Sequence, residues 1–142
     1  MNLEILPAFD YPQEVRALFS EYTQMLIAGD SSFSQYLALQ YYDEEIAHLE
    51  KKYGPPWGRL DSENGEMKRL YVRPEFRGRQ IGDDLVRRII ADAKEIGYSH
   101  MLLDTLPFLE SALRVYKRFG FDEIPCYNNS PMKSSIYMKL DL

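Results

Sequence analysis

The sequence predicts a mixed α/β fold of the α+β kind, in which helices pack against a single mixed sheet. Three observations carry this prediction. A strongly periodic amphipathic segment at residues 80–96 lies between two short apolar segments typical of strands. The end of the chain alternates apolar and polar side chains, the pattern of a strand with one buried face. Helical and strand patterns follow one another in the order βααβαβαββ, which indicates one mixed sheet.

The first half of the chain is predicted to be mainly helical. Asn2–Leu6 has the length of a short first strand. Asp10 is a candidate N-cap with Gln13 three residues later, the spacing of a capping box, and the helix it begins extends to about Ala28. A second, less regular helical pattern extends from about Ser32 to Lys52 and ends at a Gly-Pro-Pro sequence.

The second half alternates strands with helices. The segment at residues 80–96 is the clearest element, because its apolar residues recur on one stripe and Gly97 supplies a C-cap. The elements that we expect are the strand Met67–Val72, the helix Gln80–Ile96, the buried strand Tyr98–Thr105, a helix from Pro107 to Gly120, and the strands Phe121–Tyr127 and Ser134–Asp141.

Length and composition limit the classes of protein to consider. With 142 residues, 45% of them hydrophobic, the chain has room for one core, and we expect a single domain over residues 1–142. No apolar run approaches the ~20 residues that span a bilayer, so no membrane partner is expected. The one cysteine, Cys126, cannot form an internal disulfide, which is typical of a reducing compartment and predicts a cytoplasmic location.

The charge pattern argues against a nucleic-acid partner and for a compact anionic ligand. The net charge is −5, whereas nucleic-acid-binding domains usually carry a basic excess. The basic residues are nevertheless clustered, and a local basic patch on an acidic chain suits a small anion better than a long polyanion. Six arginines fall within twenty residues: Arg69, Arg73, Arg77, Arg79, Arg87 and Arg88.

The stretch Glu66–Gly82, EMKRLYVRPEFRGRQIG, contains the most informative local pattern. A short apolar strand leads through a Pro turn and an Arg/Gly loop into the helix at residues 80–96. The first amides of a helix lack intrahelical acceptors, and the helix dipole adds partial positive charge at that end. A strand, a glycine-bearing loop and a helix N-terminus in this order predict a site for phosphate.

Two motifs in this half resemble those of the GNAT superfamily of N-acetyltransferases. Arg77-Gly78-Arg79-Gln80-Ile81-Gly82 is similar to the family's acyl-CoA-binding signature, Arg/Gln-x-x-Gly-x-Gly/Ala. The segment Ala112–Phe121 resembles the family's Ala-x-x-x-Tyr-x-x-x-Gly-Phe helix, with Tyr116 at the tyrosine position. The resemblance covers nearly all of residues 66–142 and, more weakly, the two N-terminal helices.

The resemblance implies acetyl-CoA as a cosubstrate and no metal. The amides of Arg79–Asp83 would hold the pyrophosphate, Arg77 would add charge, and Leu70–Val72 would pair through its backbone with the pantetheine arm. The arm would lie where the strands at residues 67–72 and 98–105 separate. The implied coenzyme-binding residues are Leu70, Tyr71, Val72, Arg77, Gly78, Arg79, Gln80, Ile81, Gly82 and Asp83.

The sequence departs from the family pattern at two places. Gln80 stands where the loop usually has its first glycine; its amide remains, so we expect a side chain that points away and a negative φ. The usual β-hairpin before the Glu66 strand is shortened, because Gly54–Gly65 is too short for two strands of ~5–6 residues and a turn. Trp57–Leu60 would supply one very short strand at most, leaving the Glu66 strand as an edge or paired with the first strand.

The resemblance implies two catalytic residues, each with a plain structural alternative. Tyr116 would protonate the departing thiolate, since a phenol with an ordinary pKa of ~10 is protonated at pH 7; its neighbours fit a packed helix face equally well. Glu66 aligns with a general base that acts directly or through water, the alternative being a surface Glu beside Lys68. The amide of Val72 would polarise the thioester carbonyl.

Other candidates are open between a role near the acceptor and an ordinary structural one. Asp104, at the end of a strand, could bind an amine or be a turn residue. Tyr127-Asn128-Asn129 could lie near the acceptor or form a polar turn. His48 and His100 lack partners at metal-ligand spacing, so no metal site is expected.

These observations favour an acetyl-CoA-dependent N-acetyltransferase that passes the acetyl group directly to a primary amine of a small molecule or peptide. The alternative is a catalytically weak or inactive CoA-binding domain that acts as a sensor or interaction module. A general nucleotide-binding domain is disfavoured because the sequence has no Gly-Lys-Ser/Thr motif and no Gly-x-Gly-x-x-Gly motif after a strand. An exposed sheet edge would favour a homodimer.

Overall fold

A computed structural model describes residues 2–35, 42–48, 59–130 and 132–142. The chain divides into two compact units, residues 1–54 and 55–142. The described part of the first unit is helical, and the second unit holds the sheet. The expectation of one domain over residues 1–142 stays a prediction.

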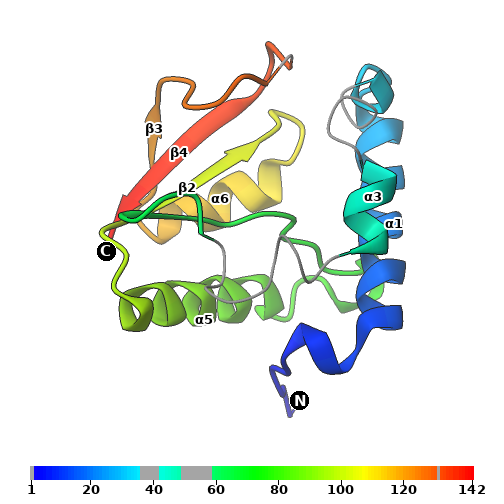
Figure 1. The fold of residues 1–142 in the computed structure, drawn as a ribbon. Helices are drawn as coiled ribbons and strands as arrows, with labels where there is room; N and C mark the ends of the chain where they lie inside the picture. The colour runs from blue at the N-terminus through cyan, green and yellow to red at the C-terminus, as the bar shows by residue number, and fades with distance from the viewer. Residues whose placement is uncertain (1, 36–41, 49–58, 131) are drawn as a thin grey trace. The chain divides into compact units, whose positions relative to one another are not determined.

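The first unit contains the short 3₁₀ helix η1 (Ala8–Asp10) and the helices α1 (Pro12–Gly29) and α3 (Tyr42–Ala47). Proline is well suited to the first position of α1, because the N–H it lacks would have no intrahelical acceptor there. The Nε of Arg16 donates a hydrogen bond to the carbonyl of Ile46 over 3.1 Å, so that α1 and α3 lie side by side (Figure 1).

Two expectations for this unit are wrong in detail. Residues 2–6 form no strand. The N-cap of α1 is Tyr11 and no side chain caps it, whereas Asp10 ends η1, because Pro12 sets the first turn of the helix. The expected second helix, Ser32–Lys52, is helical at residues 33–35 and 42–47, and the rest of that range is partly outside the described residues.

The second unit is built on a four-stranded mixed sheet, as predicted. Its order is β1-β2-β4-β3; β1 is parallel to β2, and β4 is antiparallel to both β2 and β3. The strands are β1 (Asn64–Glu66), β2 (His100–Thr105), β3 (Asp122–Ile124) and β4 (Ile136–Asp141), and the helices are the 3₁₀ turn η2 (Pro74–Phe76), α5 (Ile81–Ile96) and α6 (Glu110–Arg118).

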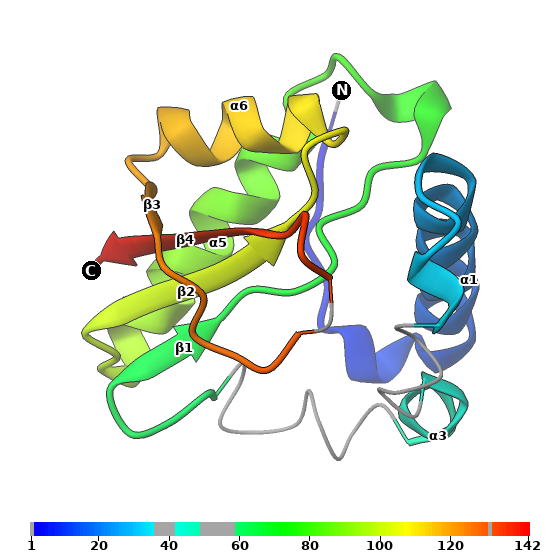
Figure 2. The ribbon, with the colours of Figure 1, turned by 90° about the horizontal axis from the view of Figure 1, so that it is seen from above.

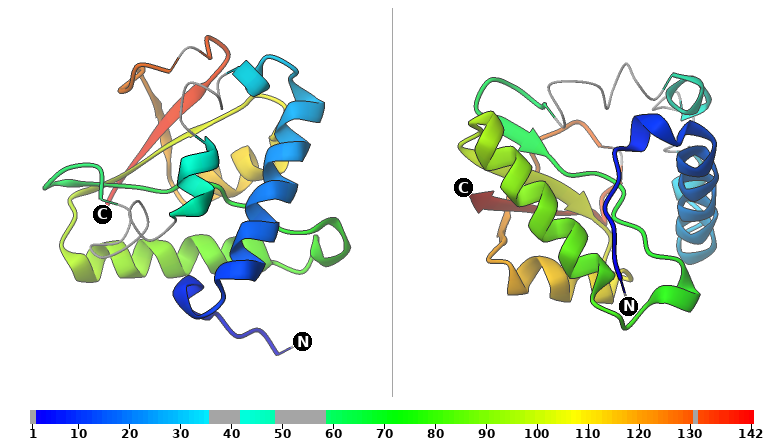
Figure 3. Two further views of the ribbon diagram at one scale, coloured as in Figure 1. Left: turned by 45° about the vertical axis from the view of Figure 1, so that its right-hand side comes forward. Right: turned by 90° about the horizontal axis from the view of Figure 1, so that it is seen from below.

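The two faces of this sheet have different environments. Both α5 and α6 contribute to the core on one face. The helix α5 lies behind the strands in Figure 2 and in front of them in the right-hand view of Figure 3, and α6 lies behind β2 in Figure 1. Met101, Leu103 and Met138 belong to the hydrophobic core on that face, together with Val86 of α5 and Tyr116 of α6. Successive residues of a strand point to opposite faces and paired residues share one. The other face therefore carries a second set, which includes Glu66, Leu102, Lys139, Asp104, Tyr137 and Ile124.

Several element boundaries in this unit differ from the prediction. The helix α5 and its C-cap Gly97, with φ 99°, are confirmed. The expected strand Met67–Val72 is wrong, because strand pairing falls on residues 64–66 and ends with the Met67 N–H bonded to the Leu102 carbonyl at 2.9 Å. The helix α6 begins at Glu110 instead of Pro107, and β3 and β4 are shorter than expected.

A tight turn precedes β1. Arg59 forms an isolated antiparallel bridge with Gly65, and the Leu60 N–H bonds to the Asn64 carbonyl at 3.0 Å. The Asp61 carboxylate accepts hydrogen bonds from the N–H groups of Glu63 and Asn64, both at 2.8 Å. The sequence before β1 thus contributes a bridge of one residue, in line with the very short strand expected at 57–60; residues 57 and 58 lie outside the described part of the chain.

Candidate active site

The loop before α5 has the backbone features of an anion site. Gly78 and Gln80 both have left-handed backbone conformations, with φ of 75° and 62°. Gln80 is the N-cap, and among the described residues no side chain caps the helix. The first intrahelical bond joins the Asp84 N–H to the Gln80 carbonyl at 3.0 Å. The amides of residues 81–83 precede that bond, at the positive end of the helix dipole.

The conformation of Gln80 corrects the expectation of a negative φ. Its φ of 62° and ψ of 11° are those that a glycine would adopt most easily. The side chain is exposed, so no packing forces this conformation on it. The loop therefore keeps the backbone geometry of a glycine at this position although the residue carries a Cβ atom.

Arg77 and Arg79 are each anchored within the loop. The Nε of Arg77 donates to the carbonyl of Val72 at 2.9 Å, which ties the loop to the extended segment that follows β1. The guanidinium carbon of Arg79 lies 5.7 Å from the centre of the Phe76 ring, a cation–π distance. Two of the residues expected to bind the coenzyme, Val72 and Arg77, are thus in direct contact.

Asp83, near the start of α5, forms an ion pair with a residue of α6. The Nε of Arg118, in the last turn of α6, donates to the Oδ1 of Asp83 at 2.9 Å. This ion pair joins the start of α5 to the end of α6. It also offsets the negative charge that Asp83 would otherwise place beside the helix N-terminus.

Glu66 is a half-buried residue with two partners. Its side chain is 14% exposed, and the Nζ of Lys68, itself 18% exposed, lies 3.6 Å from its Oε1. The hydroxyl of Tyr127 donates a hydrogen bond to the same Oε1 at 2.9 Å. The contact with Lys68 agrees with the structural alternative, and the bond from Tyr127 adds a partner that neither interpretation predicts, so the role of Glu66 stays a prediction.

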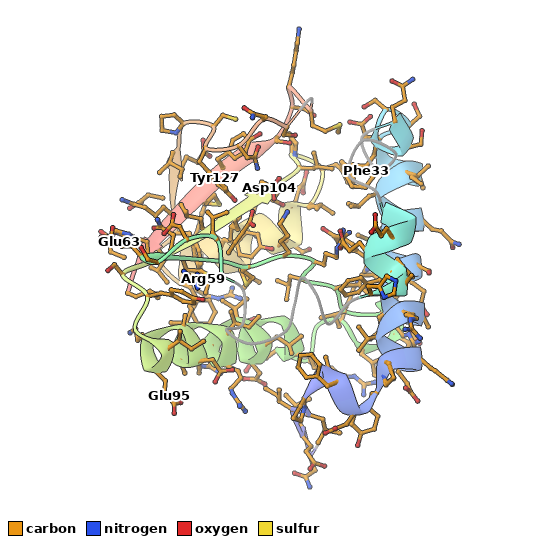
Figure 4. The ribbon with its side chains drawn as sticks, viewed as in Figure 1. Phe33, Arg59, Glu63, Glu95, Asp104 and Tyr127 are labelled. Carbon is orange, nitrogen blue, oxygen red and sulfur yellow. The ribbon has the colours of Figure 1, made fainter. Side chains whose placement is uncertain are left out.

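Tyr127 connects Glu66 to further groups on the same face of the sheet. Burial, followed by the charges of Glu66 and Asp104, raises the pKa of Tyr127 well above its ordinary value. Its ring packs edge-on against that of Tyr137, with 5.4 Å between centroids. Figure 4 shows Tyr127 and Asp104 near each other. Burial, and next a hydrogen bond with Cys126, raises the pKa of Tyr137.

Tyr116 lies in a different environment from Glu66. It is 6% exposed and belongs to the core on the face covered by α5 and α6. The centroid of its ring lies 5.8 Å from that of Phe121. Glu66 points to the opposite face, toward Tyr127. The two expected catalytic side chains are therefore on different faces of the sheet, and their roles stay predictions.

The segment between β1 and η2 leaves the sheet as expected for an opening between two strands. The bond from Met67 to Leu102 is the last of the β1–β2 ladder, and Arg69 then has a φ of 61°. Residues 67–73 belong to no helix or strand. Leu70, Tyr71 and Val72 therefore follow the end of the β1–β2 ladder and are not part of it.

The described residues contain neither a cluster of metal ligands nor a helix that could span a membrane. Groups of three or more His, Cys, Asp or Glu side chains that could hold a metal ion are absent from ranges 2–35, 42–48, 59–130 and 132–142. In the same ranges, every helix is too short or too polar to cross a membrane.

Comparison with known proteins identifies the family. The profile of the acetyltransferase (GNAT) family matches residues 4–121, which is more than half of the chain. The chain belongs to this family. The predicted resemblance, fold class and N-acetyltransferase type of enzyme are thereby confirmed.

One curated relative matches almost the whole length. An uncharacterized N-acetyltransferase of Schizosaccharomyces pombe is 37% identical over 160 residues, which cover 96% of this chain and 94% of that protein. The aligned stretch is longer than the 142 residues of this GNAT protein, so the relative has residues without a counterpart here.

Solved structures share the fold. A GNAT-family acetyltransferase from Staphylococcus aureus Mu50 superposes with a TM-score of 0.67 at 18% identity, covering 93% of this chain and 96% of that one. A GNAT-family acetyltransferase from Elizabethkingia anophelis, solved with acetyl-CoA bound, gives a TM-score of 0.51 at 22% identity over 59% of this chain and 64% of that one.

Proposed function

We propose that this GNAT protein transfers an acetyl group from acetyl-CoA directly to a primary amine. The observation that carries the proposal is the start of α5, where two left-handed residues, Gly78 and Gln80, lead into a helix without a side-chain cap among the described residues. This geometry suits a pyrophosphate. A related structure with acetyl-CoA bound supports the choice of coenzyme.

The residues of the loop fit the coenzyme in chemistry and in space. The amides of residues 81–83 would hold the pyrophosphate, and Arg77 and Arg79 would add positive charge. A Cβ atom built on Gly78 or Gly82 would meet nothing within 4 Å, so the loop leaves room beside its backbone. The extended segment Leu70–Val72 would hydrogen-bond the pantetheine arm.

Each catalytic step falls to a residue of this chain. Acetyl-CoA would supply an activated acetyl thioester. Glu66 would accept the proton that the acceptor ammonium must lose before it can attack, and the acceptor would displace Lys68 from that carboxylate. The Val72 amide would donate a hydrogen bond to the thioester carbonyl as it gains charge. Tyr116 would donate a proton to the departing thiolate.

Calorimetry with acetyl-CoA tests the loop. We expect Arg77→Ala to weaken binding by roughly 10- to 100-fold, the loss of a charge-assisted hydrogen bond. The matched control is Arg88→Ala, which removes an exposed arginine from α5 that pairs with Asp92. Equal affinity of the Arg77 variant and the control would contradict the assignment.

A thiol-release assay over a panel of primary amines then tests transfer. Tyr116→Phe should lower turnover by about 100-fold or more if the phenol acts as the acid. Burial of Tyr116 in the core is the specific observation that favours the second candidate function, a CoA-binding domain with little or no transferase activity. Binding of acetyl-CoA without turnover of any amine would support that second function.

The acceptor class, the oligomeric state and the location are the finer parts of the proposal. We expect a small-molecule or peptide amine, and the acidic net charge of −5 favours a cationic one. Among the described strands, β1 is at one end of the sheet order. An edge strand can pair with a second copy of the chain, so we still expect a homodimer. We still expect a cytoplasmic location, because a chain with one cysteine cannot form an internal disulfide.

A further inference from the structure

The contact between Tyr127 and Glu66 joins two segments that are far apart in the sequence. The donor and the acceptor are 61 residues apart, and the O–O distance is 2.9 Å. The hydroxyl reaches Glu66 from the connection between β3 and β4, while Glu66 is the last residue of β1. Neither local turn formation nor helix packing requires this bond.

The ring of Tyr127 is held in place by its surroundings. It packs at 5.4 Å and 78° against Tyr137, which is 7% exposed and lies opposite Asp104 in the β2–β4 register. The chain after it folds on itself, since the Ser130 N–H bonds to the Oδ1 of Asn128 at 3.0 Å. The position of the hydroxyl is therefore set by packing.

The hydroxyl is also a permanent donor toward Glu66. Burial and the nearby charges raise the pKa of Tyr127, so the phenol keeps its proton throughout the physiological range. Charged groups on this face in the described part of the sheet unit include Lys68, at 3.6 Å from Glu66, and Asp104. Lys139 shares the face, because it lies opposite Leu102, the residue paired with Glu66. Both Lys68 and Tyr127 contact Oε1 of Glu66.

We propose that Tyr127 is a positioning residue that holds the Glu66 carboxylate for its work on the acceptor amine. A Glu carboxylate turns easily about its last torsion, which has a broad energy profile. A donor on Oε1 fixes the plane of the group and directs Oε2 along one line. The inference rests on the proposed function, since it assigns Tyr127 a role only if Glu66 serves as the base.

The test uses the full chain and two matched variants. Tyr127→Phe removes only the hydroxyl and keeps the ring against Tyr137. Tyr137→Phe removes the neighbouring hydroxyl, which hydrogen-bonds with Cys126 and Ser130. Both are measured for kcat and KM with the best amine of the panel and for acetyl-CoA binding by calorimetry.

We expect Tyr127→Phe to lower kcat roughly 10- to 100-fold, as misplacement of a reacting group does, while acetyl-CoA binding stays unchanged. The loss should fall on kcat more than on KM for the amine, because Tyr127 orients the base and is not itself assigned a contact with the acceptor. Tyr137→Phe should change neither quantity.

A double-mutant cycle of unfolding free energies, measured without acetyl-CoA, gives a test that does not depend on activity. Denaturant unfolding of Tyr127→Phe, Glu66→Gln and the double variant should show a coupling that Tyr137→Phe does not show with Glu66→Gln. If the parent protein turns over the amine and Tyr127→Phe does so at the same rate, this inference alone is overturned. Absence of turnover in the parent protein would overturn the proposed function as well.

Discussion

Gln80 offers the sharpest test of the loop before α5. Its φ of 62° places a residue with a Cβ atom in the left-handed region. That conformation costs roughly 1–2 kcal/mol for an ordinary L-residue and almost nothing for glycine. Glycine in turn gives back about 0.4–1 kcal/mol through the greater freedom of the unfolded chain. The difference predicts that Gln80→Gly raises the free energy of unfolding by about 0.5–1 kcal/mol.

Two further variants separate the backbone effect from the loss of the side chain. Gln80→Ala keeps the Cβ atom and should differ from the parent protein by less than about 0.5 kcal/mol, since the side chain is exposed. Gln80→Val should be the least stable of the series, because a β-branched residue fits the left-handed region worst. The expected order of stability is therefore Gly, then Gln and Ala together, then Val.

Urea unfolding of the full chain, followed by circular dichroism, measures this order through the transition midpoints at a constant slope. The same variants bear on the coenzyme site. If backbone amides hold the pyrophosphate, Gln80→Gly should bind acetyl-CoA at least as tightly as the parent protein does. A glycine variant less stable than the alanine variant would refute the left-handed conformation on which this reasoning depends.

Two other predictions concern the start of the sheet. A Cβ atom on Gly65 would lie 2.9 Å from Cδ2 of the buried Tyr98 ring. Gly65→Ala should therefore destabilise the protein by about 1–3 kcal/mol, measured by thermal unfolding. An unchanged stability would contradict this prediction, because it would mean that the ring can move aside. Hydrogen bonds, first from the Asn64 side chain and next from the Glu63 N–H, lower the pKa of Asp61 below its ordinary value of 3.8. Asp61 therefore adds stability above that pH and loses it as the pH falls through the lowered pKa. The difference in Tm between the parent protein and Asp61→Asn should shrink as the pH falls below 3.8, and a difference that stays constant with pH would contradict this account.

Elements with strong local patterns could be predicted from the sequence. The periodicity of α5 and the glycine after it were sufficient, because amphipathic packing and a left-handed C-cap are both local requirements. The mixed sheet followed from the order of the elements. The motif at residues 77–82 also placed the candidate phosphate loop correctly at the start of a helix.

Other features depended on contacts that the sequence does not show. The strand β1 falls on Asn64–Glu66 and not on the more apolar Met67–Val72, because pairing with β2 and the close approach of Gly65 to Tyr98 decide the register. Local apolar content could not reveal that. Gln80 adopts a glycine-like φ although residue type alone favours a negative one.

The partner of Glu66 was the least predictable feature of the candidate site. In the sequence, Tyr127 is part of a polar segment before the last strand, for which a role near the acceptor and a simple turn are equally good explanations. The turn is present, since the Asn128 side chain accepts the Ser130 N–H. The hydrogen bond to Glu66 forms because the segment between β3 and β4 passes over the face of the sheet that carries Glu66. The spacing of residues in the sequence does not indicate that path.

The two-sided arrangement explains how one opening in the sheet could serve a reaction that needs groups from both faces. The β1–β2 ladder ends at Met67, so the edge of β2 beyond Leu102 is where the backbones of the two segments separate. Glu66 lies at that point and faces Tyr127, whereas Tyr116 lies in the core on the helix side. A thioester held between the two segments would receive the amine from the Glu66 face and meet the phenol on the helix face. Under the proposed function, the amine would lose its proton on the Glu66 face and the thiolate would be protonated from the helix face, so that Glu66 and Tyr116 would act from different sides of the bound thioester.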